Sequence, residues 1–308
     1  MRRTILLLAA MVLSLVVASG IAMAGSIAVD TSPGTAAPPS TLGPYTMTPF
    51  APDGRPLDTQ VTSVAAPAGA AGGLQFDRAL LHARIGFGWG TWSHGYTGDV
   101  YWTDTEDQVV MTLPQNTQAF YFYVEPNEQS IHNVTATASD GTTSGPVAVN
   151  GFGGAKYFGF YTTNGSTLST ITVDVDPAAV GFAVGEFGIA VDAIHPRVTN
   201  TVPGGGATGV APWANVTATF SEDMKASTIN GSTVKLFKTG STTKVGATVS
   251  YNASLDRAIL NPNNPLQRGT SYRAVVTTGA QDLAGNSLDQ NRSLSGLQQK
   301  QWFFKVRN

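Results

Sequence analysis

Apolar and polar residues alternate with a period of two along most of this chain, and no other feature constrains its fold as strongly. The alternation is clearest at residues 109–113, 134–138 and 171–176. A period of two places successive side chains on opposite faces of a strand, whereas an amphipathic helix needs apolar residues three and four positions apart. No window of a dozen residues combines that helical spacing with capping residues. The 34 glycines and a charged fraction of only 12% fit short strands joined by tight turns, so the chain is predicted to be all-β.

Two aromatic segments, residues 120–124 and 157–161, indicate how the strands of the first half pack. In each segment the Phe side chains share one face of the strand and the Tyr side chains share the other. We expect Phe to point inward and Tyr outward, because a phenol oxygen needs a hydrogen-bond partner or water. Strands with one apolar face pack as antiparallel sheets, face to face. Residues 56–190 are therefore predicted to form a jelly-roll-like β-sandwich.

Residues 1–24 have the three parts of a secretory signal peptide. A basic start at residues 1–3 is followed by an apolar run at 5–17 and by the cleavage pattern Ala-Met-Ala at 22–24. The apolar run is short for a membrane span, so we prefer cleavage over the alternative of an uncleaved anchor. No cysteine is present, which excludes disulfides, thiolate zinc sites and lipidation at the cleavage site. The protein is expected to be secreted, with no transmembrane anchor after cleavage.

Composition divides the rest of the chain. Residues 25–55 are rich in Pro, Ala, Ser and Thr and are predicted to be a disordered leader, because such a segment buries too little apolar surface to offset its ordering entropy. The jelly-roll-like domain follows at 56–190, a short hinge at 191–196 and a second domain at 197–308.

The two halves differ strongly in charge. Residues 25–190 contain fourteen acidic and four basic residues, and residues 191–308 contain six acidic and twelve basic residues. The second half has no arginine stripe and the first is acidic, so nucleic acid is not an expected partner. We expect the basic half to hold the protein non-covalently to anionic cell-wall polymers, an association that salt weakens.

The second domain resembles a known family. Val-Pro-Gly-Gly-Gly-Ala-Thr-Gly-Val at 202–210 precedes Val-Thr-Ala-Thr-Phe-Ser-Glu-Asp-Met at 216–224, and Asp-Leu-Ala-Gly-Asn follows at 282–286. This order and spacing resemble the bacterial Ig-like domain of the S-layer-protein type. The resemblance implies a seven-stranded Greek-key sandwich on a surface or secreted protein. It leaves the function open, since a fold does not fix one.

The first half is similar, at residues 88–101 and 181–190, to exported bacterial β-sandwich proteins of unassigned role. That similarity implies a secreted sandwich and no activity.

An aromatic-rich run at residues 89–102 is the first candidate site. Trp92, Tyr96, Tyr101 and Trp102 are the candidate ligand-binding residues, because exposed aromatic faces stack on sugar rings. We hypothesise that they form a platform for extracellular polysaccharide. The alternative is that these side chains fill the core between the sheets.

Three carboxylates in one loop, Asp104, Glu106 and Asp107, are the candidate ligands for Ca²⁺, which prefers oxygen ligands. Their spacing matches neither an EF-hand nor a repeat-type calcium motif, so a solvated acidic loop is the alternative. The 282–286 segment is interpreted as a structural turn, with a calcium role as its alternative. No other cofactor is expected.

No catalytic motif is present. The sequence lacks H-E-x-x-H and G-x-S-x-G, and the adjacent pair Ser93 and His94 is expected to point to opposite faces of a strand. Paired carboxylates of a glycosidase come from separate strands and leave no sequence motif. We therefore predict a non-catalytic cell-surface or matrix protein, with an adhesion or spacer module and a glycan-binding sandwich. A carbohydrate-active hydrolase, or its accessory binding module, is the alternative.

Overall fold

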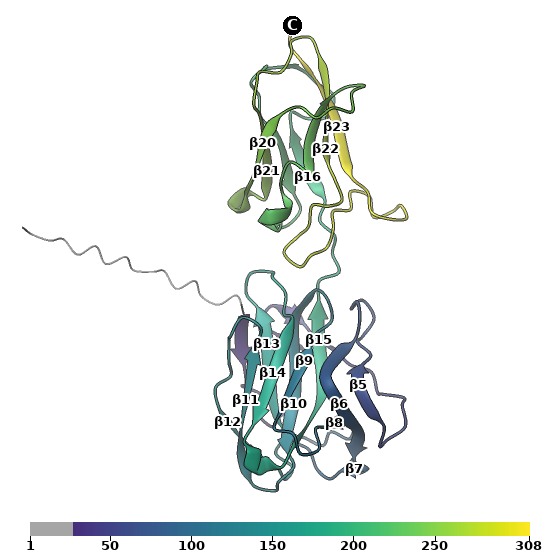
Figure 1. Ribbon diagram of the computed structural model, residues 1–308, viewed down its shortest axis with the longest axis vertical. Coiled ribbons are helices and arrows are strands. Elements are labelled where there is room, and N and C mark those ends of the chain that lie inside the picture. The colour runs from purple at the N-terminus through teal and green to yellow at the C-terminus, as the bar shows by residue number, and fades with distance from the viewer. Residues whose placement is uncertain (1–26) are drawn as a thin grey trace, which may run out of the picture.

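The computed structural model describes residues 27–308, so the signal peptide predicted at 1–24 lies outside the described residues. The predicted all-β class is confirmed: the described chain forms two β-sandwich domains that follow one another along the long axis of the molecule (Figure 1). Residues 27–308 contain no helix that is long and apolar enough to cross a membrane.

The first domain is a single sheet that folds over to make two layers. β6 makes the turn, because its residues 75–76 pair with β9 and its residues 81–83 pair with β8. The strand order is β1-β13-β10-β15-β8-β6-β9-β14-β11-β12, with β4, β5 and β7 paired beside this path. The strands are β1 (Ile27–Asp30), β4 (Thr48–Pro49), β5 (Gln60–Val64), β6 (Leu74–Ile85), β7 (Gly88–Trp89), β8 (Asp99–Trp102), β9 (Gln108–Thr112), β10 (Thr117–Pro126), β11 (Ile131–Ala138), β12 (Val147–Asn150), β13 (Lys156–Thr162), β14 (Thr170–Val175) and β15 (Phe182–Val191). A small hairpin, β2 (Thr41–Leu42) and β3 (Tyr45–Thr46), and a 3₁₀ turn, η1 (Pro177–Ala179), complete the domain.

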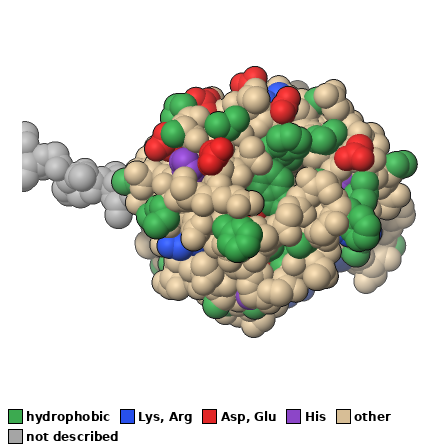
Figure 2. All heavy atoms as spheres, turned by 90° about the horizontal axis from the view of Figure 1, so that it is seen from below, with side chains coloured by type: hydrophobic (Ala, Val, Ile, Leu, Met, Phe, Trp, Pro, Cys, Tyr) green, Lys and Arg blue, Asp and Glu red, His purple; other side chains and the backbone are tan. Residues whose placement is uncertain are grey.

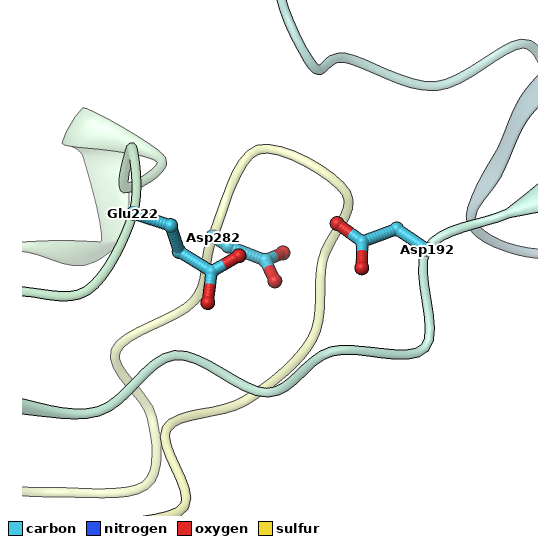
Figure 3. Close-up of side chains that lie close together, drawn as sticks. All are labelled: Asp192, Glu222 and Asp282. Atoms are coloured by element: carbon cyan, nitrogen blue, oxygen red, sulfur yellow. The ribbon is translucent and has the colours of Figure 1, made fainter. Parts of the chain in front are cut away.

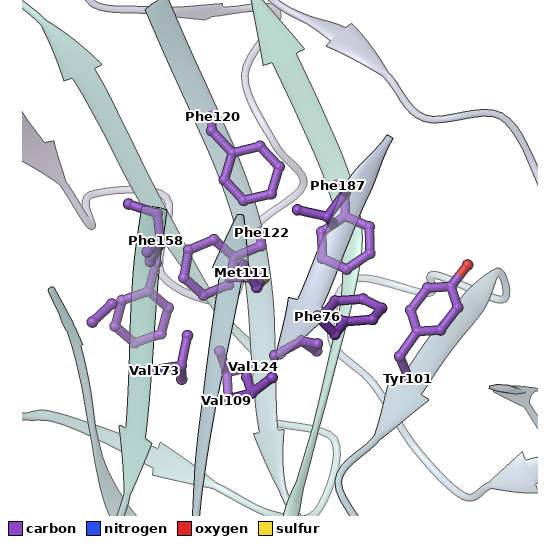
Figure 4. Packing of buried hydrophobic residues seen from close by; sticks show 14 of the residues in the cluster. Phe76, Tyr101, Val109, Met111, Phe120, Phe122, Val124, Phe158, Val173 and Phe187 are labelled. Atoms are coloured by element: carbon purple, nitrogen blue, oxygen red, sulfur yellow. The ribbon is translucent and has the colours of Figure 1, made fainter. Parts of the chain in front are cut away.

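The core between the two layers contains the residues that the alternation predicts. Phe120, Phe122 and Phe158 from β10 and β13 are fully buried and face Met111 and Val173 from β9 and β14 (Figure 4). The rings of Phe122 and Phe158 stack with centroids 5.6 Å apart. The inward direction predicted for the Phe residues is confirmed.

The Tyr face of the same strands is not exposed, which corrects the prediction. Tyr121, Tyr123 and Tyr157 are each at most 2% exposed and belong to a second apolar cluster with Leu42 and Trp92. Tyr123 donates its hydroxyl hydrogen to Ala36 O in the covering chain, whereas the buried Tyr157 hydroxyl has no hydrogen-bond partner within residues 27–308.

The chain that covers this face is the segment predicted to be a disordered leader, and that prediction is wrong from Ile27 onward. β1 pairs with β13 and forms the edge of the sheet, and Leu42 is 1% exposed. The Tyr157 backbone N–H donates to Gly34 O at 2.9 Å. The physical reason is that the tyrosine face supplies the apolar surface that a Pro- and Ala-rich segment cannot bury alone.

The second domain consists of two four-stranded sheets, β16-β18-β21-β20 and β17-β23-β22-β19. Val216, Ala218 and Phe220 on β18 are buried, as are Trp302 and Phe304 on β23, as the alternation predicts. The strands are β16 (Val198–Val202), β17 (Ala207–Val210), β18 (Val216–Phe220), β19 (Val234–Lys238), β20 (Ala247–Asn252), β21 (Arg257–Pro262), β22 (Ser271–Val276) and β23 (Lys300–Val306), with 3₁₀ turns η2 (Ala226–Thr228) and η3 (Ala253–Leu255).

Hydrogen bonds connect the two domains where β15 ends at Val191. The Asp192 backbone N–H donates to Asn116 O at 2.9 Å, and the Asn116 side chain donates to Asn286 Oδ1 at 2.7 Å. Asn286 closes the turn predicted at 282–286, in which Asp282 Oδ1 accepts the backbone N–H of Gly285 and Asn286. Gly285 has a φ of +100°, a conformation that favours glycine.

Candidate functional site

The four aromatic candidates do not form a flat exposed platform. Trp92 and Tyr101 are buried, and Tyr96 and Trp102 are half-buried. Trp102 packs against Trp89, and the indole N–H of Trp92 donates to Glu186 Oε2 at 3.1 Å. Tyr96 and Tyr101 line a cleft, and Trp92 packs against Tyr96; neither Trp92 nor Trp102 lines the cleft.

This cleft has a volume of about 530 Å³ and opens beside β15 and the loop between β7 and β8. Its walls combine aromatic rings with a small number of polar groups, which is the usual composition of a small-ligand site. The aromatic residues are Phe50, Tyr96, Tyr101, Tyr121 and Phe187, and the charged ones are Arg84, Asp99 and Glu186. Phe187 packs against Tyr101, with ring centroids 5.7 Å apart and nearly parallel planes.

Asp99 is the centre of the polar group at one wall. Its Oδ1 accepts hydrogen bonds from Arg84 at 2.8 and 3.0 Å and lies 3.1 Å from His82 Nε2. Its Oδ2 accepts the Asp53 backbone N–H at 2.8 Å. Burial opposes ionisation of Asp99, but these hydrogen bonds outweigh it and hold its pKa below the ordinary value. The carboxylate is therefore ionised and fixed.

Glu186 lines the same cleft from β15, the strand that pairs with β8, and its surroundings differ from those of Asp99. Burial raises its pKa, against hydrogen bonds from His94 and Trp92 that favour the ionised form. Its backbone has a φ of +53°, a left-handed conformation that is rare for glutamate and often found at functional sites. Sequence reasoning missed Glu186, although a single carboxylate within the apolar run at 181–190 is a signal that could have revealed it. Arg84 and Asp99 gave no comparable signal.

Ser93, His94 and Glu186 form a chain of hydrogen bonds, so the adjacent Ser and His do contact each other, contrary to expectation. Ser93 Oγ lies 3.0 Å from His94 Nδ1, and His94 Nε2 lies 2.8 Å from Glu186 Oε1. The positive φ of His94, +39°, turns its side chain back toward Ser93. The chain resembles a nucleophile, a base and an orienting carboxylate.

The geometry does not activate Ser93, however. His94 Nδ1 also lies 3.1 Å from Thr35 O, and a carbonyl oxygen only accepts, so Nδ1 carries a hydrogen. A protonated Nδ1 cannot take the proton of the serine hydroxyl. Ser93 is moreover 3% exposed.

The calcium candidates Asp104, Glu106 and Asp107 do not gather around a common point, since Glu106 turns toward Arg78. Among residues 27–308, the group of three whose carboxylate oxygens all lie within 4.8 Å of one another is Asp192, Glu222 and Asp282 (Figure 3). These residues are far apart in the sequence, so no spacing pattern could reveal them.

The three carboxylates lie in a hollow between the two domains, to which Gln118 and Asn164 of the first domain also contribute. Burial and the neighbouring charges of Asp282 and Asp192 raise the pKa of Glu222 to about 7. Burial also raises the pKa of Asp282, against hydrogen bonds from Asn286. Oxygen ligands in this number can hold a divalent cation, and without one they repel each other.

Comparison with known proteins assigns the second domain. Residues 192–306 match the family described as Bacterial Ig-like domain. No curated protein matches the chain. Similar solved structures include the N-terminal part of the bacterial S-layer protein SbsC, at 18% identity and a TM-score of 0.28 over 37% of this chain and 24% of that one. They also include rSbsC(31-844) and SbsC domains 1–6, each at 18% identity over 37% of this chain and 14% of theirs, with TM-scores of 0.28 and 0.29. This chain therefore spans less than a quarter of the length of those proteins.

The family match does not reach the first domain, so the similarity of that domain to exported β-sandwich proteins stays a prediction. Residues 192–306 are a bacterial Ig-like domain, as the sequence motifs predicted.

Proposed function

We propose that the protein is a non-catalytic cell-surface protein that binds a chain of extracellular polysaccharide in the cleft of its first domain. The Ig-like domain serves as a spacer or adhesion module. Support for export comes from the sequence of residues 1–24, which lie outside the described structure. The observation that carries the binding role is the cleft itself, with aromatic walls and polar groups held in place before any ligand arrives.

The chemistry of the cleft suits a saccharide. Sugar rings present C–H groups that pack on aromatic faces such as those of the half-buried Phe50 and Tyr96, while their hydroxyls need fixed donors and acceptors. Arg84 supplies donors, and Glu186 supplies acceptors. A second hollow of about 690 Å³ shares Ala51, Pro52 and Val64 with the cleft, so the binding surface continues beyond one sugar unit.

A glycoside hydrolase is the second candidate, because two carboxylates with opposite pKa shifts line the same cleft. Such a pair is the usual arrangement of an acid and a base. Binding is favoured over hydrolysis because the oxygens of both groups are already engaged. Asp99 accepts from Arg84 and Asp53, and Glu186 contacts His94 and Trp92. These partners hold both carboxylates as fixed hydrogen-bond acceptors, which suits the binding of sugar hydroxyls better than proton transfer to a glycosidic oxygen.

Filling the cleft tests the binding role. Thr97 lines the cleft and is exposed, so Thr97→Trp adds bulk there without removing a core side chain. Thr112→Trp on the exposed face of β9 is the matched control. We expect the native protein and the control to bind the same polysaccharides on a glycan array, and Thr97→Trp to bind about tenfold more weakly, a loss of about 1.4 kcal/mol. Absence of any glycan hit, or equal binding by all three proteins, would contradict the proposal.

Assay of the same polysaccharides for released reducing ends separates the two candidates. We expect none above the level of a Glu186→Gln variant. Release that this substitution abolishes would assign the cleft to a hydrolase.

A further inference from the structure

The end of the first domain that lies farthest from the Ig-like domain exposes large apolar side chains. We call it the distal end; it is formed by η1, β7 and the loop that follows β10 (Figure 1). Within residues 27–191, the large hydrophobic residues that are strongly exposed all lie here: Phe87, Ile131, Phe152 and Val180. Three of them are more than 60% exposed. Such a gathering of exposed apolar groups marks an interaction surface.

The same end is acidic. Asp104, Asp107, Glu128 and Asp176 are exposed there, and none of them forms an ion pair within residues 27–308. Figure 2 looks at this end and shows hydrophobic side chains spread over it, with acidic side chains gathered in the upper part of the view. The distal end therefore combines apolar contact area with negative charge.

The opposite end of the molecule is basic. We call it the far end; it lies where β23 reaches the C-terminal residues (Figure 1). Lys238, Arg268, Lys305 and Arg307 are exposed there, and Arg268 donates to Asn308 O. Trp213 is 66% exposed, with the Arg307 guanidinium 5.2 Å from its ring centroid.

The acidic residues of the Ig-like domain are absent from the far end. Glu222 and Asp282 gather with Asp192 at the junction, and Asp289 donates its backbone N–H to Pro196 O in the hinge. Asp256 interacts with Asp223, next to Glu222 in the sequence. Four exposed basic residues at the far end and four exposed acidic residues at the distal end therefore give the two ends of the folded protein opposite charge.

We propose that the distal end of the first domain docks on the far end of the Ig-like domain of a second copy of this chain, so that copies associate head to tail. The two surfaces are complementary in charge, and each presents exposed apolar side chains to its partner. Because they lie at opposite ends of the long axis, they cannot meet within one chain. A contact between different surfaces leaves one of each free, so the association continues beyond a dimer.

Sedimentation velocity of the purified protein tests this inference. At low salt we expect the average sedimentation coefficient to rise with concentration from about 5 to 300 μM without levelling at a dimer. In about 1 M NaCl the protein should return to a monomer, because charge attraction is then screened within about 3 Å. A monomer at every concentration, or an association that levels at a dimer, would overturn the proposal.

Charge reversal at each end gives the sharper test. The triple variant Lys238→Glu, Arg268→Glu, Lys305→Glu has two acidic ends, and Asp104→Lys, Asp107→Lys, Glu128→Lys has two basic ends. We expect each variant to be monomeric alone and to associate when mixed with the other, with circular dichroism unchanged. All six positions are exposed, so little effect on folding is expected, and the circular dichroism comparison checks Asp104→Lys in particular, because Asp104 has a φ of +62°.

Failure of the mixture to associate would overturn the head-to-tail contact. The proposal would also be overturned if the native protein stayed monomeric and its far end bound an anionic polysaccharide such as polygalacturonate. The basic residues of the far end would then bind a polymer and not a second copy of the chain. Neither result bears on the cleft, which Thr97→Trp tests separately.

Discussion

Glu222 is the residue whose ionisation most directly opposes the folded structure. Its pKa rises from 4.5 to about 7 because it is partly buried beside Asp282 and Asp192. Well below pH 4.5 the carboxyl group is neutral in the folded and unfolded states alike. As the pH rises toward 7, the unfolded state loses the proton first, so the folded state becomes progressively less stable.

Glu222→Gln removes this ionisation. In buffer containing EDTA, we expect the variant to melt at a higher temperature than the native protein at about pH 8 and at the same temperature near pH 4. Calorimetry at several pH values measures the difference, with the exposed Glu128→Gln as control. A Tm difference that does not grow between pH 4 and 8 would contradict the assigned role of the cluster.

Gly188 shows a second constraint at the scale of single residues. A Cβ at this position would lie 2.2 Å from the ring of Tyr121, which is fixed between β15 and the covering segment. We expect Gly188→Ala to destabilise the protein by about 1–3 kcal/mol, the usual effect of overpacking. Urea unfolding measures it, and Gly90→Ala, where a Cβ would meet nothing within 4 Å, should be nearly neutral. Equal midpoints for the two variants would show that Tyr121 can move.

At the scale of elements, the segment from β1 to β4 turns the tyrosine face of β10 and β13 into a second core of the first domain. Leu42 is its most buried residue. We expect Leu42→Ala to cost about 2–5 kcal/mol, as for other buried leucines. The neighbouring Thr41→Ala, at an exposed position, should change stability by less than about 0.5 kcal/mol in the same urea titration. A small effect at Leu42 would indicate that the segment detaches easily.

This segment also shows which elements the sequence can predict. The strands with regular alternation, such as β9, β11, β14 and β18, have the buried faces that a period of two predicts. The leader prediction was wrong because it counted only what the segment can bury by itself. Its partner is the tyrosine face of β10 and β13, which was expected to point outward, and no local pattern shows that a distant segment covers this face.

The candidate site was predictable to a similar degree. Tyr96 and Tyr101 stood out as aromatic residues, but their place in a cleft depends on Phe50 and Phe187, which come from distant segments. Arg84, Asp99 and Glu186 lie on β6, β8 and β15, and no local pattern links them. The acidic cluster at the junction depends in the same way on the docking of two domains.

At the scale of the whole molecule, the junction combines hydrogen bonds that connect the domains with carboxylates that repel. Asn116 donates to Asn286, which in turn donates to Asp192 O and to Asp282 Oδ2. Asn116→Gly removes the first donor while keeping the left-handed backbone, since Asn116 has a φ of +61°. Asp58→Gly is the matched control, because Asp58 has a φ of +60° but is far from the junction.

We expect Asn116→Gly to increase motion between the domains without lowering the melting temperature of either one. Small-angle X-ray scattering should give a larger radius of gyration for this variant than for Asp58→Gly or the native protein. The difference should be greater at about pH 8 than at about pH 5, because Glu222 is ionised at the higher pH and adds repulsion across the hollow. Identical scattering curves at both pH values would mean that the Asn116 bond does not hold the domains together. An increase that is the same at both pH values would assign the effect to the hydrogen bond alone and exclude a contribution from the carboxylates.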